Sequence, residues 1–124
     1  MIADCDAPRD VPAARLRTLR RRAQFLALNR ARRAATPGFV LQARDRADGD
    51  AAIGVGFTCS RKVGNAVARN RAKRRLRAAA AQLLPTWGRP GWDYVLIGRR
   101  DVTAARPWPD LLGDLRAALD RVHA

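Results

Sequence analysis

Residues 51–84 read AAIGVGFTCSRKVGNAVARNRAKRRLRAAAAQLL and contain a strand candidate followed by the longest helix candidate of the chain. Within residues 51–59, large β-branched and aromatic side chains alternate with small ones, and this alternation predicts a strand. Gly54 and Gly56 lie on the opposite face of that strand from its large side chains. This face could therefore accept a close neighbour, either helix backbone or a ligand.

The helix predicted over residues 65–84 has an apolar stripe and a basic side. With about 100° of rotation per residue, the stripe covers about one third of the circumference and should pack on a sheet. Gly64 permits a tight turn before the helix, Asn65 suits the N-cap position, and Pro85 closes the helix. The stripe consists of Ala72, Leu76, Ala79, Ala80 and Leu83, and the basic side carries Asn70, Lys73, Arg74 and Arg77.

Further elements are predicted on both sides of this stretch. Residues 38–46 and 92–98 are rich in strand-forming side chains and predict two more strands. Asp48-Gly49-Asp50 predicts a hairpin between residues 38–46 and the strand over 51–59.

Two more helices are predicted near the ends of the chain. Phe25 and Leu28, which are three residues apart, predict a short amphipathic helix over residues 21–29. Thr36-Pro37-Gly38 breaks any helix before the first strand. A last helix follows Pro107 and Pro109 and has one apolar side made of Leu112, Leu115, Leu119 and Val122.

These elements predict an α/β (α+β) two-layer sandwich with about four strands in one mixed sheet and three helices, in the order α-β-β-β-α-β-α. The chain of 124 residues is long enough for one modest core. We expect residues 1–14 to form a disordered N-terminal tail and residues 15–124 to form a single α/β domain.

The composition indicates an anionic partner and excludes several classes of protein. The chain carries 25 Lys and Arg against 11 Asp and Glu, a formal net charge of +14, which favours nucleic acid over a membrane surface. Cys5 and Cys59 form no metal-binding or disulfide pattern, so we expect no metal site and a reducing compartment. The N-terminus lacks a signal peptide, and no apolar run approaches the ~20 residues of a membrane span. We therefore expect a cytoplasmic protein.

Residues 60–77 carry eight basic side chains and no acid. Such a run is often the solvated side of a helix, but an exposed structural helix gains from Glu–Lys pairs four residues apart, and this one has only like charges. The amide of Asn70 could recognise a base edge or a 2′-hydroxyl. The N–H groups of the first turn, beside Arg61 and Lys62, favour an anion. The run therefore predicts binding to nucleic acid.

The order of these motifs resembles that of bacterial ribonuclease P proteins. Residues 64–67, GNAV, and residues 69–74, RNRAKR, are similar to the family signature G-N-A-V-x-R-N-R-x-K-R. They follow residues 55–62, VGFTCSRK, which are similar to the strand and S-K-K turn of the family. Further matches are Phe25 on the first helix, residues 38–41 and residues 93–97. Agreement in order and spacing runs from residue 15 to residue 120.

The resemblance implies a left-handed βαβ crossover, although the general rule predicts the opposite hand. It implies partnership with a catalytic RNA and with precursor tRNA, from which the 5′ leader is removed, without a membrane or an obligate protein partner. It assigns the chemistry to Mg²⁺ bound mainly by the RNA and the substrate, so no side chain here is a catalytic acid, base or nucleophile, or a metal ligand. The RNA-binding residues that it implies are Arg61, Lys62, Asn65, Arg69, Asn70, Arg71, Lys73, Arg74 and Arg77.

The family contacts the leader in a cleft between the first helix and the sheet, and this chain departs from the family pattern there. Asn29 and Gln42 stand where the family often has aromatic residues, which leaves Phe25 as the candidate for stacking on a base. An aromatic residue on an amphipathic helix is, however, more often part of the core. We interpret Phe39 and Phe57 as core and His123 as solvated.

Two other classes of function remain open at this point. A ribosomal or nucleoid architectural protein would also bind nucleic acid, but without supporting a reaction. A membrane-surface protein is disfavoured because the apolar sides are short and are needed for a core.

Overall fold

The computed structural model describes residues 16–29 and 31–124, so the tail predicted over 1–14 lies outside the described residues. Along the chain the elements are β2 (Leu16–Thr18), α1 (Arg22–Leu28), β3 (Arg32–Ala35), β4 (Phe39–Asp45), β5 (Ile53–Thr58), the 3₁₀ turn η1 (Arg61–Val63), α2 (Ala66–Trp87), β6 (Trp92–Gly98), α3 (Val102–Ala105) and α4 (Trp108–Val122). The described part of the chain therefore contains the three predicted helices and the short additional α3.

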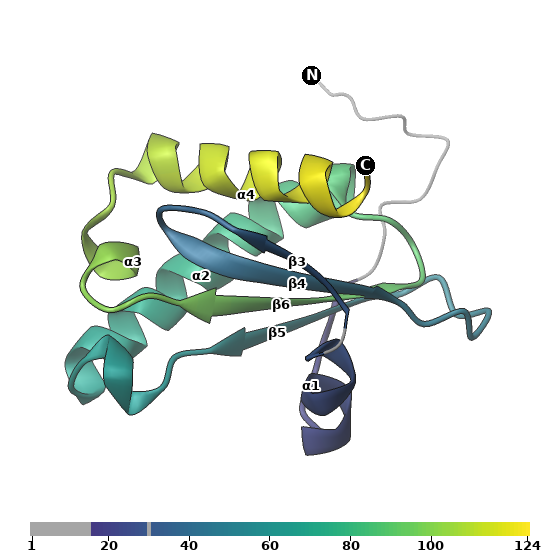
Figure 1. The fold of residues 1–124 in the computed structure, drawn as a ribbon, viewed down its shortest axis with the longest axis horizontal. Helices are drawn as coiled ribbons and strands as arrows, with labels where there is room; N and C mark the ends of the chain where they lie inside the picture. Colours follow the sequence, from purple (N-terminus) through teal and green to yellow (C-terminus); the bar gives the residue numbers. More distant parts are fainter. Residues whose placement is uncertain (1–15, 30) are drawn as a thin grey trace.

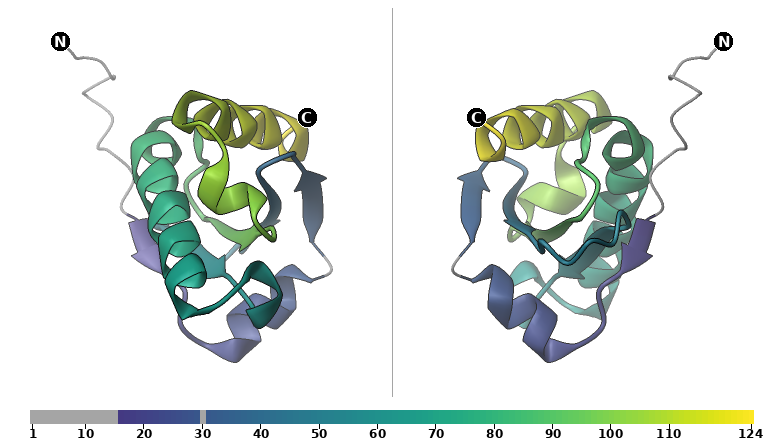
Figure 2. Two further views of the ribbon diagram at one scale, coloured as in Figure 1. Left: turned by 90° about the vertical axis from the view of Figure 1, so that its left-hand side faces the viewer. Right: turned by 90° about the vertical axis from the view of Figure 1, so that its right-hand side faces the viewer.

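One mixed sheet forms the centre of the fold, in the strand order β2-β5-β6-β4-β3. β5 is parallel to β2 and β6, whereas β4 is antiparallel to β6 and β3. Helices α2 and α4 cover one face of the sheet and α1 lies on the other (Figures 1 and 2). The predicted α/β class is confirmed, but the sheet has five strands rather than about four. The element order starts with β2, because Leu16–Thr18 pairs with β5 in a stretch where the sequence has no alternation that would indicate a strand.

The crossover from β5 through α2 to β6 is left-handed. In Figure 1 both strands run toward the left with β6 above β5, and α2 passes behind the sheet. Figure 2 shows the same placement of α2 from the side. A right-handed crossover would place β6 below β5 in this view, so the handedness that the resemblance implies is confirmed.

The hairpin predicted at Asp48-Gly49-Asp50 is wrong. β4 and β5 are not neighbours, because β6 lies between them and pairs with both. β6 is buried along its middle and takes the central position, where both of its faces are covered. Local turn chemistry therefore did not decide the pairing. The hairpin of this region is instead β3–β4, and its turn is closed by Thr36, whose backbone N–H and hydroxyl both bond to the Phe39 carbonyl.

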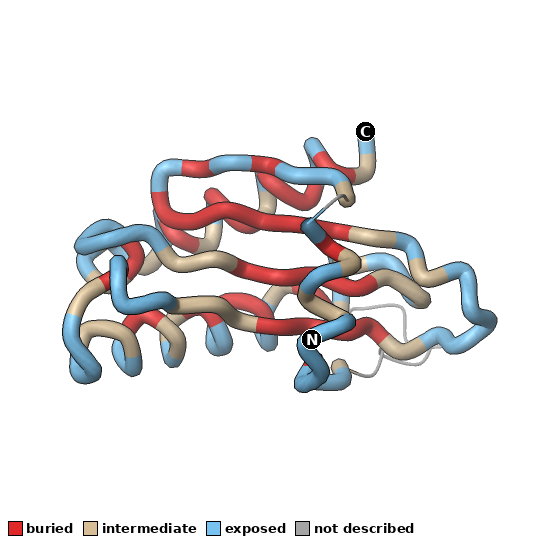
Figure 3. The backbone as a smooth tube through the Cα atoms, turned by 60° about the horizontal axis from the view of Figure 1, so that its bottom comes forward, coloured by how far each residue is buried: buried red, intermediate tan, exposed pale blue. Residues whose placement is uncertain are grey.

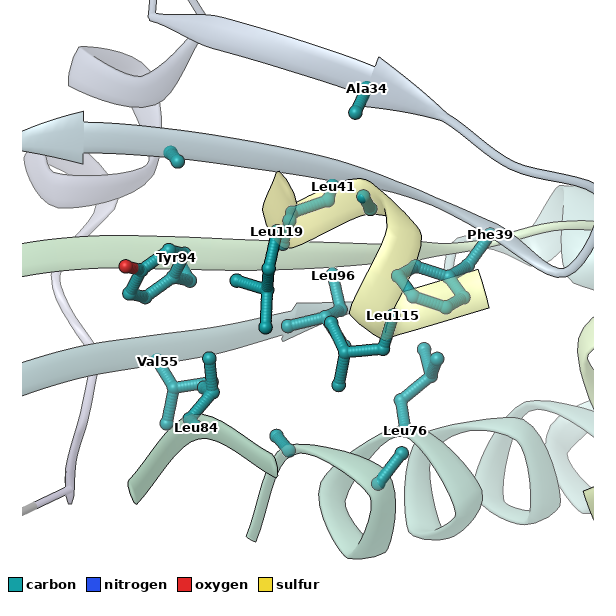
Figure 4. Packing of buried hydrophobic residues seen from close by; sticks show 14 of the residues in the cluster. Ala34, Phe39, Leu41, Val55, Leu76, Leu84, Tyr94, Leu96, Leu115 and Leu119 are labelled. Carbon is teal, nitrogen blue, oxygen red and sulfur yellow. The ribbon is translucent and has the colours of Figure 1, made fainter. Parts of the chain in front are cut away.

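The main core lies between the sheet and the α2–α4 layer. Leu76 and Leu84 of α2, Leu115 and Leu119 of α4, and Tyr94 of β6 meet there (Figure 4). Figure 3 shows that the buried stretches follow the central strands. The predicted α2 stripe is confirmed over its first four members, whereas its end shifts from Leu83 to Leu84, because Leu84 continues the four-residue spacing from Leu76 through Ala80.

The predicted end of α2 is displaced by about one turn, and the predicted start of the buried side of α4 by one residue. α2 continues through Pro85 to Trp87, since a proline near the end of a helix removes only one hydrogen bond and Gly88 N–H still bonds to the Leu84 carbonyl at 2.8 Å. In α4, Leu111 rather than Leu112 begins the buried side, while Leu115, Leu119 and Val122 are buried as predicted.

The interpretation of His123 as solvated is wrong. Its ring packs edge-on against Trp92, with centroids 4.5 Å apart, and its Nε2 lies 2.7 Å from the hydroxyl of Tyr94. The Tyr94 hydroxyl accepts the Arg89 N–H at 2.8 Å, and it can donate its own proton to an unprotonated Nε2. Tertiary packing at the end of α4 thus gives a near-terminal histidine a structural role.

This packing predicts an acid-sensitive contribution to stability. Burial, and then the charges of Arg89 and Arg32, lower the pKa of His123 from 6.5 to about 4. Because the unfolded chain takes up a proton first, the free energy of unfolding should fall as the pH drops from 6.5 toward 4. After allowance for partial exposure of the ring we expect a loss of roughly 1–2 kcal/mol. Thermal unfolding of the protein and of His123→Phe, followed between pH 7 and 4.5, measures it. The difference between the two proteins should change with pH, and a constant difference would contradict the prediction.

Candidate nucleic-acid interface

The exposed side of α2 carries most of the residues predicted to bind RNA. The side chains of Asn70, Arg71, Arg74 and Arg77 are exposed, and those of Arg69 and Lys73 are half-buried. The sequence has no Asp or Glu from residue 51 to residue 92. Within the described ranges, none of the ion pairs involves an α2 side chain. The structure therefore places an uncompensated row of cations along one side of a 22-residue helix.

The start of α2 is built by local hydrogen bonds. Asn65 caps the helix, since its side-chain oxygen accepts the Ala68 N–H at 2.9 Å. Ser60 caps η1 by accepting the Lys62 N–H at 3.3 Å, and Arg61 and Lys62 are exposed on that turn. The cap uses the amide oxygen of Asn65, so any ligand at this position would meet the remaining NH₂ group.

Gly64 gives the tight turn that the sequence predicts before α2. Its φ of 149° is a conformation that side-chain-bearing residues rarely adopt. A Cβ at this position would also lie 2.9 Å from the Cβ of Ala68. The turn brings η1, with Arg61 and Lys62, directly against the first turn of the helix.

One basic residue of the run points the other way. Arg75 is half-buried, and its guanidinium donates to the backbone carbonyls of Thr103, Ala104 and Arg106. The helical wheel contains a signal for this, because Arg75 is three residues after Ala72 and four before Ala79, both in the buried stripe. Counting charges along the sequence does not reveal it.

Two aromatic residues that the sequence assigned to the core lie on β4 and β5. Phe39 is wholly buried, as predicted. Phe57 is partly buried against the same core, and the guanidinium carbon of Arg77 lies 5.7 Å from its ring centroid. The Phe57 ring thus supports a member of the basic side of α2.

The residues of the implied leader cleft lie on the α1 side of the molecule. Phe25 is half-buried, and its ring atoms lie 2.7 Å from where a Cβ of Gly56 would be. Gln42 is 5 % exposed and pairs with Val95, which belongs to the small core beneath α1. Asn29 is the exposed C-cap of α1. The sequence predicted a close neighbour on the glycine face of β5. At Gly56 this neighbour is the Phe25 side chain.

The other strand glycine has a different neighbour. At Gly54 a Cβ would lie 2.0 Å from a carboxylate oxygen of Asp93, which is itself paired with Arg46. Two glycines on one strand therefore serve packing, and neither leaves an open space for a ligand beneath α1.

The carboxylates of the described residues do not fit a protein-held metal ion. No three His, Cys, Asp or Glu side chains in this part of the chain are arranged to hold one. Among the described residues there is also no helix long and apolar enough to cross a bilayer.

A comparison with known families decides the identity, since the family model described as Ribonuclease P matches residues 13–123. The chain belongs to the ribonuclease P protein family. It is 63% identical to the ribonuclease P protein component of Ruegeria pomeroyi over 86% of each chain. It is 52% identical to that of Paramagnetospirillum magneticum, over 90% of this chain and 86% of the relative.

Solved ribonuclease P proteins share the fold. The protein from Thermotoga maritima superposes with a TM-score of 0.71 at 25% identity, over 85% of this chain and 96% of that chain. The protein from Staphylococcus aureus superposes with a TM-score of 0.69 at 22% identity, over 84% and 93% respectively. As a ribonuclease P protein, the chain is a subunit of the endoribonuclease that processes the 5′ ends of tRNA. Association with the ribonuclease P RNA follows from this membership.

Proposed function

We propose that the basic side of α2, together with η1, binds the catalytic RNA of ribonuclease P. One observation carries the proposal: a row of exposed cations without a neighbouring carboxylate lies along a helix whose other side is fixed in the core. Guanidinium groups suit phosphate oxygens because they donate two parallel hydrogen bonds. The proposed RNA-binding residues are Arg61, Lys62, Asn65, Arg69, Asn70, Arg71, Lys73, Arg74 and Arg77.

The 5′ leader of precursor tRNA is the proposed ligand of the α1 side. The proposed leader-binding residues are Phe25, Asn29 and Gln42. Asn29 offers an exposed amide, Phe25 is half-buried, and Gln42 is 5% exposed, so Asn29 is the most accessible of the three. Contact with the leader would then rest more on hydrogen bonds than on stacking. The chain contributes no acid, base or nucleophile in this proposal, and Mg²⁺ held mainly by the RNA and the substrate supplies the hydrolytic chemistry.

In this proposal residues 15–124 act as one RNA-binding domain in the cytoplasm. The domain needs no membrane and no obligate protein partner, because the RNA neutralises its net charge of +14.

Cleavage of precursor tRNA by the cognate catalytic RNA at low Mg²⁺ tests the proposal. Adding the protein should accelerate the removal of the leader, and shortening the leader should reduce this gain. A rate equal to that of the RNA alone would contradict the proposed roles of the basic side of α2 and of the α1 side.

Val67 extends the proposed RNA-binding surface with an apolar contact. Its side chain is 75% exposed in the first turn of α2, beside the cations. Val67→Ala should raise helix stability by about 0.5 kcal/mol. The same change should weaken binding of the catalytic RNA about fivefold if the two lost methyl groups pack against it. Fluorescence titration together with thermal unfolding measures both effects. Leu26→Ala on α1, where the side chain is 51% exposed, is the matched control and should leave this affinity unchanged.

A further inference from the structure

Arg75 differs from every other basic residue in the run because its donors are used inside the protein. One terminal nitrogen lies 2.9 Å from the Thr103 carbonyl and 2.8 Å from the Ala104 carbonyl, and the other lies 2.5 Å from the Arg106 carbonyl. Its guanidinium carbon is 5.8 Å from the ring centroid of Trp108. These contacts join α2 to the segment that connects β6 to α4.

The three carbonyls belong to the C-terminal end of α3, where helix carbonyls lack partners within the helix. A cation there satisfies them and is favoured by their partial negative charge. A planar guanidinium can bind all three at once, whereas a lysine ammonium cannot reproduce this fork.

The segment that Arg75 binds is itself anchored on three sides. Thr103 is wholly buried, and its hydroxyl accepts the Arg99 N–H at 2.7 Å and donates to the Gly38 carbonyl at 2.6 Å. Arg106 forms a two-pronged ion pair with Asp114 of α4, at 2.6 and 3.1 Å. Arg75 therefore ties α2 to the ends of β4 and β6 and to α4.

We infer that Arg75 is a positioning residue for RNA binding, which holds α2 at the rotation that points Arg71 and Arg74 toward the RNA. This inference rests on the proposed function of α2. A rotation of about 20° about the helix axis would move groups at a radius of about 6 Å by about 2 Å. Such a displacement breaks hydrogen bonds between guanidinium groups and phosphates, whose lengths vary by only a few tenths of an ångström.

Charge-conserving and charge-removing variants test the inference. Arg75→Lys and Arg75→Met are compared with Arg74→Lys and Arg74→Met, in titrations of the cognate ribonuclease P RNA over a range of KCl concentrations. Both Arg75 variants should weaken binding to a similar degree, roughly three- to thirtyfold, with the salt slope unchanged. Arg74→Lys should keep the salt slope and lose less affinity than Arg74→Met, which should lower the slope by roughly 0.7–0.9.

Two outcomes would overturn the inference. Normal affinity of Arg75→Lys combined with a reduced slope for Arg75→Met would make Arg75 a phosphate contact. Unchanged affinity of both variants combined with a lower melting temperature would make its role structural only. A shallow salt slope for the unsubstituted protein would instead contradict the proposed function of α2. The two failures are distinguishable, because in that case Arg74→Lys and Arg74→Met also have the same affinity and the same slope.

A second measurement needs no variant. Modification of the unsubstituted protein with phenylglyoxal, followed by peptide mass spectrometry, should leave Arg75 unmodified both in the free protein and in the RNA complex. Arg74 should react in the free protein and be protected in the complex. If Arg75 reacts in the free protein and RNA protects it, Arg75 is an RNA contact and not a positioning residue.

Discussion

Replacing Arg71 and Arg74 together with alanine should weaken binding of the cognate ribonuclease P RNA by about a hundredfold. Each lost charge-assisted contact is worth about 1.5 kcal/mol, and a tenfold change in affinity is about 1.4 kcal/mol. If about eight phosphates are neutralised, the logarithm of affinity should fall with the logarithm of salt with a slope of roughly −6 to −7. The double variant should reduce this slope by roughly 1.5. Titrations at several KCl concentrations measure both quantities.

The same variant should keep or raise the melting temperature. Arg71 and Arg74 are exposed, alanine is the best helix former, and the helix loses two like charges. Replacing this pair separates RNA binding from folding better than replacing Arg69 does, because the Nε of Arg69 is buried without a described partner. Arg116→Ala with Arg121→Ala on α4 removes the same charge elsewhere and should change the affinity little. A salt slope near −1 for the unsubstituted protein would show that the basic side of α2 is not the binding surface.

Asp93→Ala should destabilise the protein by about 2–3 kcal/mol, because the buried guanidinium of Arg46 loses its buried partner and keeps only the exposed carboxylate of Asp48, 2.9 Å from its Nε. The carboxylate of Asp93 lies 2.7 Å from Arg46, and the two side chains are 2 % and 8 % exposed. Arg46 also donates to the carbonyls of Asp50 and Ala52, so this pair holds the long β4–β5 connection against the sheet. The loss is a large fraction of the total stability of a small domain. Urea unfolding measures it as a lower midpoint.

A surface pair of the same chemistry provides the control. The Arg17 guanidinium and the Asp50 carboxylate lie 2.8 Å apart, but their side chains are 46% and 45% exposed. Arg17→Ala should therefore cost less than about 1 kcal/mol. Equal losses for Asp93→Ala and Arg17→Ala would mean that burial does not determine the contribution of the Arg46–Asp93 pair.

The elements with strong local signals were predictable. The strand over 51–59, the strand at Trp92–Gly98 and the long basic helix are present close to their predicted bounds, because alternation and helical periodicity are properties of neighbouring residues. The motif from Gly64 to Arg74 also predicted the family to which the chain belongs. The bounds of α1 agree with the prediction to within one residue. The start of this helix is also defined locally, because the Gln24 side chain accepts the N–H groups of Arg20 and Arg21.

Elements whose existence depends on distant partners were not predictable. β2 consists of only Leu16–Thr18 and exists because β5 offers it an edge. The Asp48-Gly49-Asp50 turn resembles a hairpin locally, yet β6 enters between the two strands. His123 is near the end of the chain and looks solvated in the sequence, but α4 brings it against Trp92 and Tyr94.

The amino-acid sequence alone determined that this protein carries a long helix with one apolar and one cationic side, because charge and periodicity are written along a single continuous segment. Only the tertiary structure decided which carbonyls Arg75 binds, and that Gly54 and Gly56 receive Asp93 and Phe25. These outcomes depend on which surfaces the folded chain brings together, and the free energy of burying a side chain is set by those neighbours.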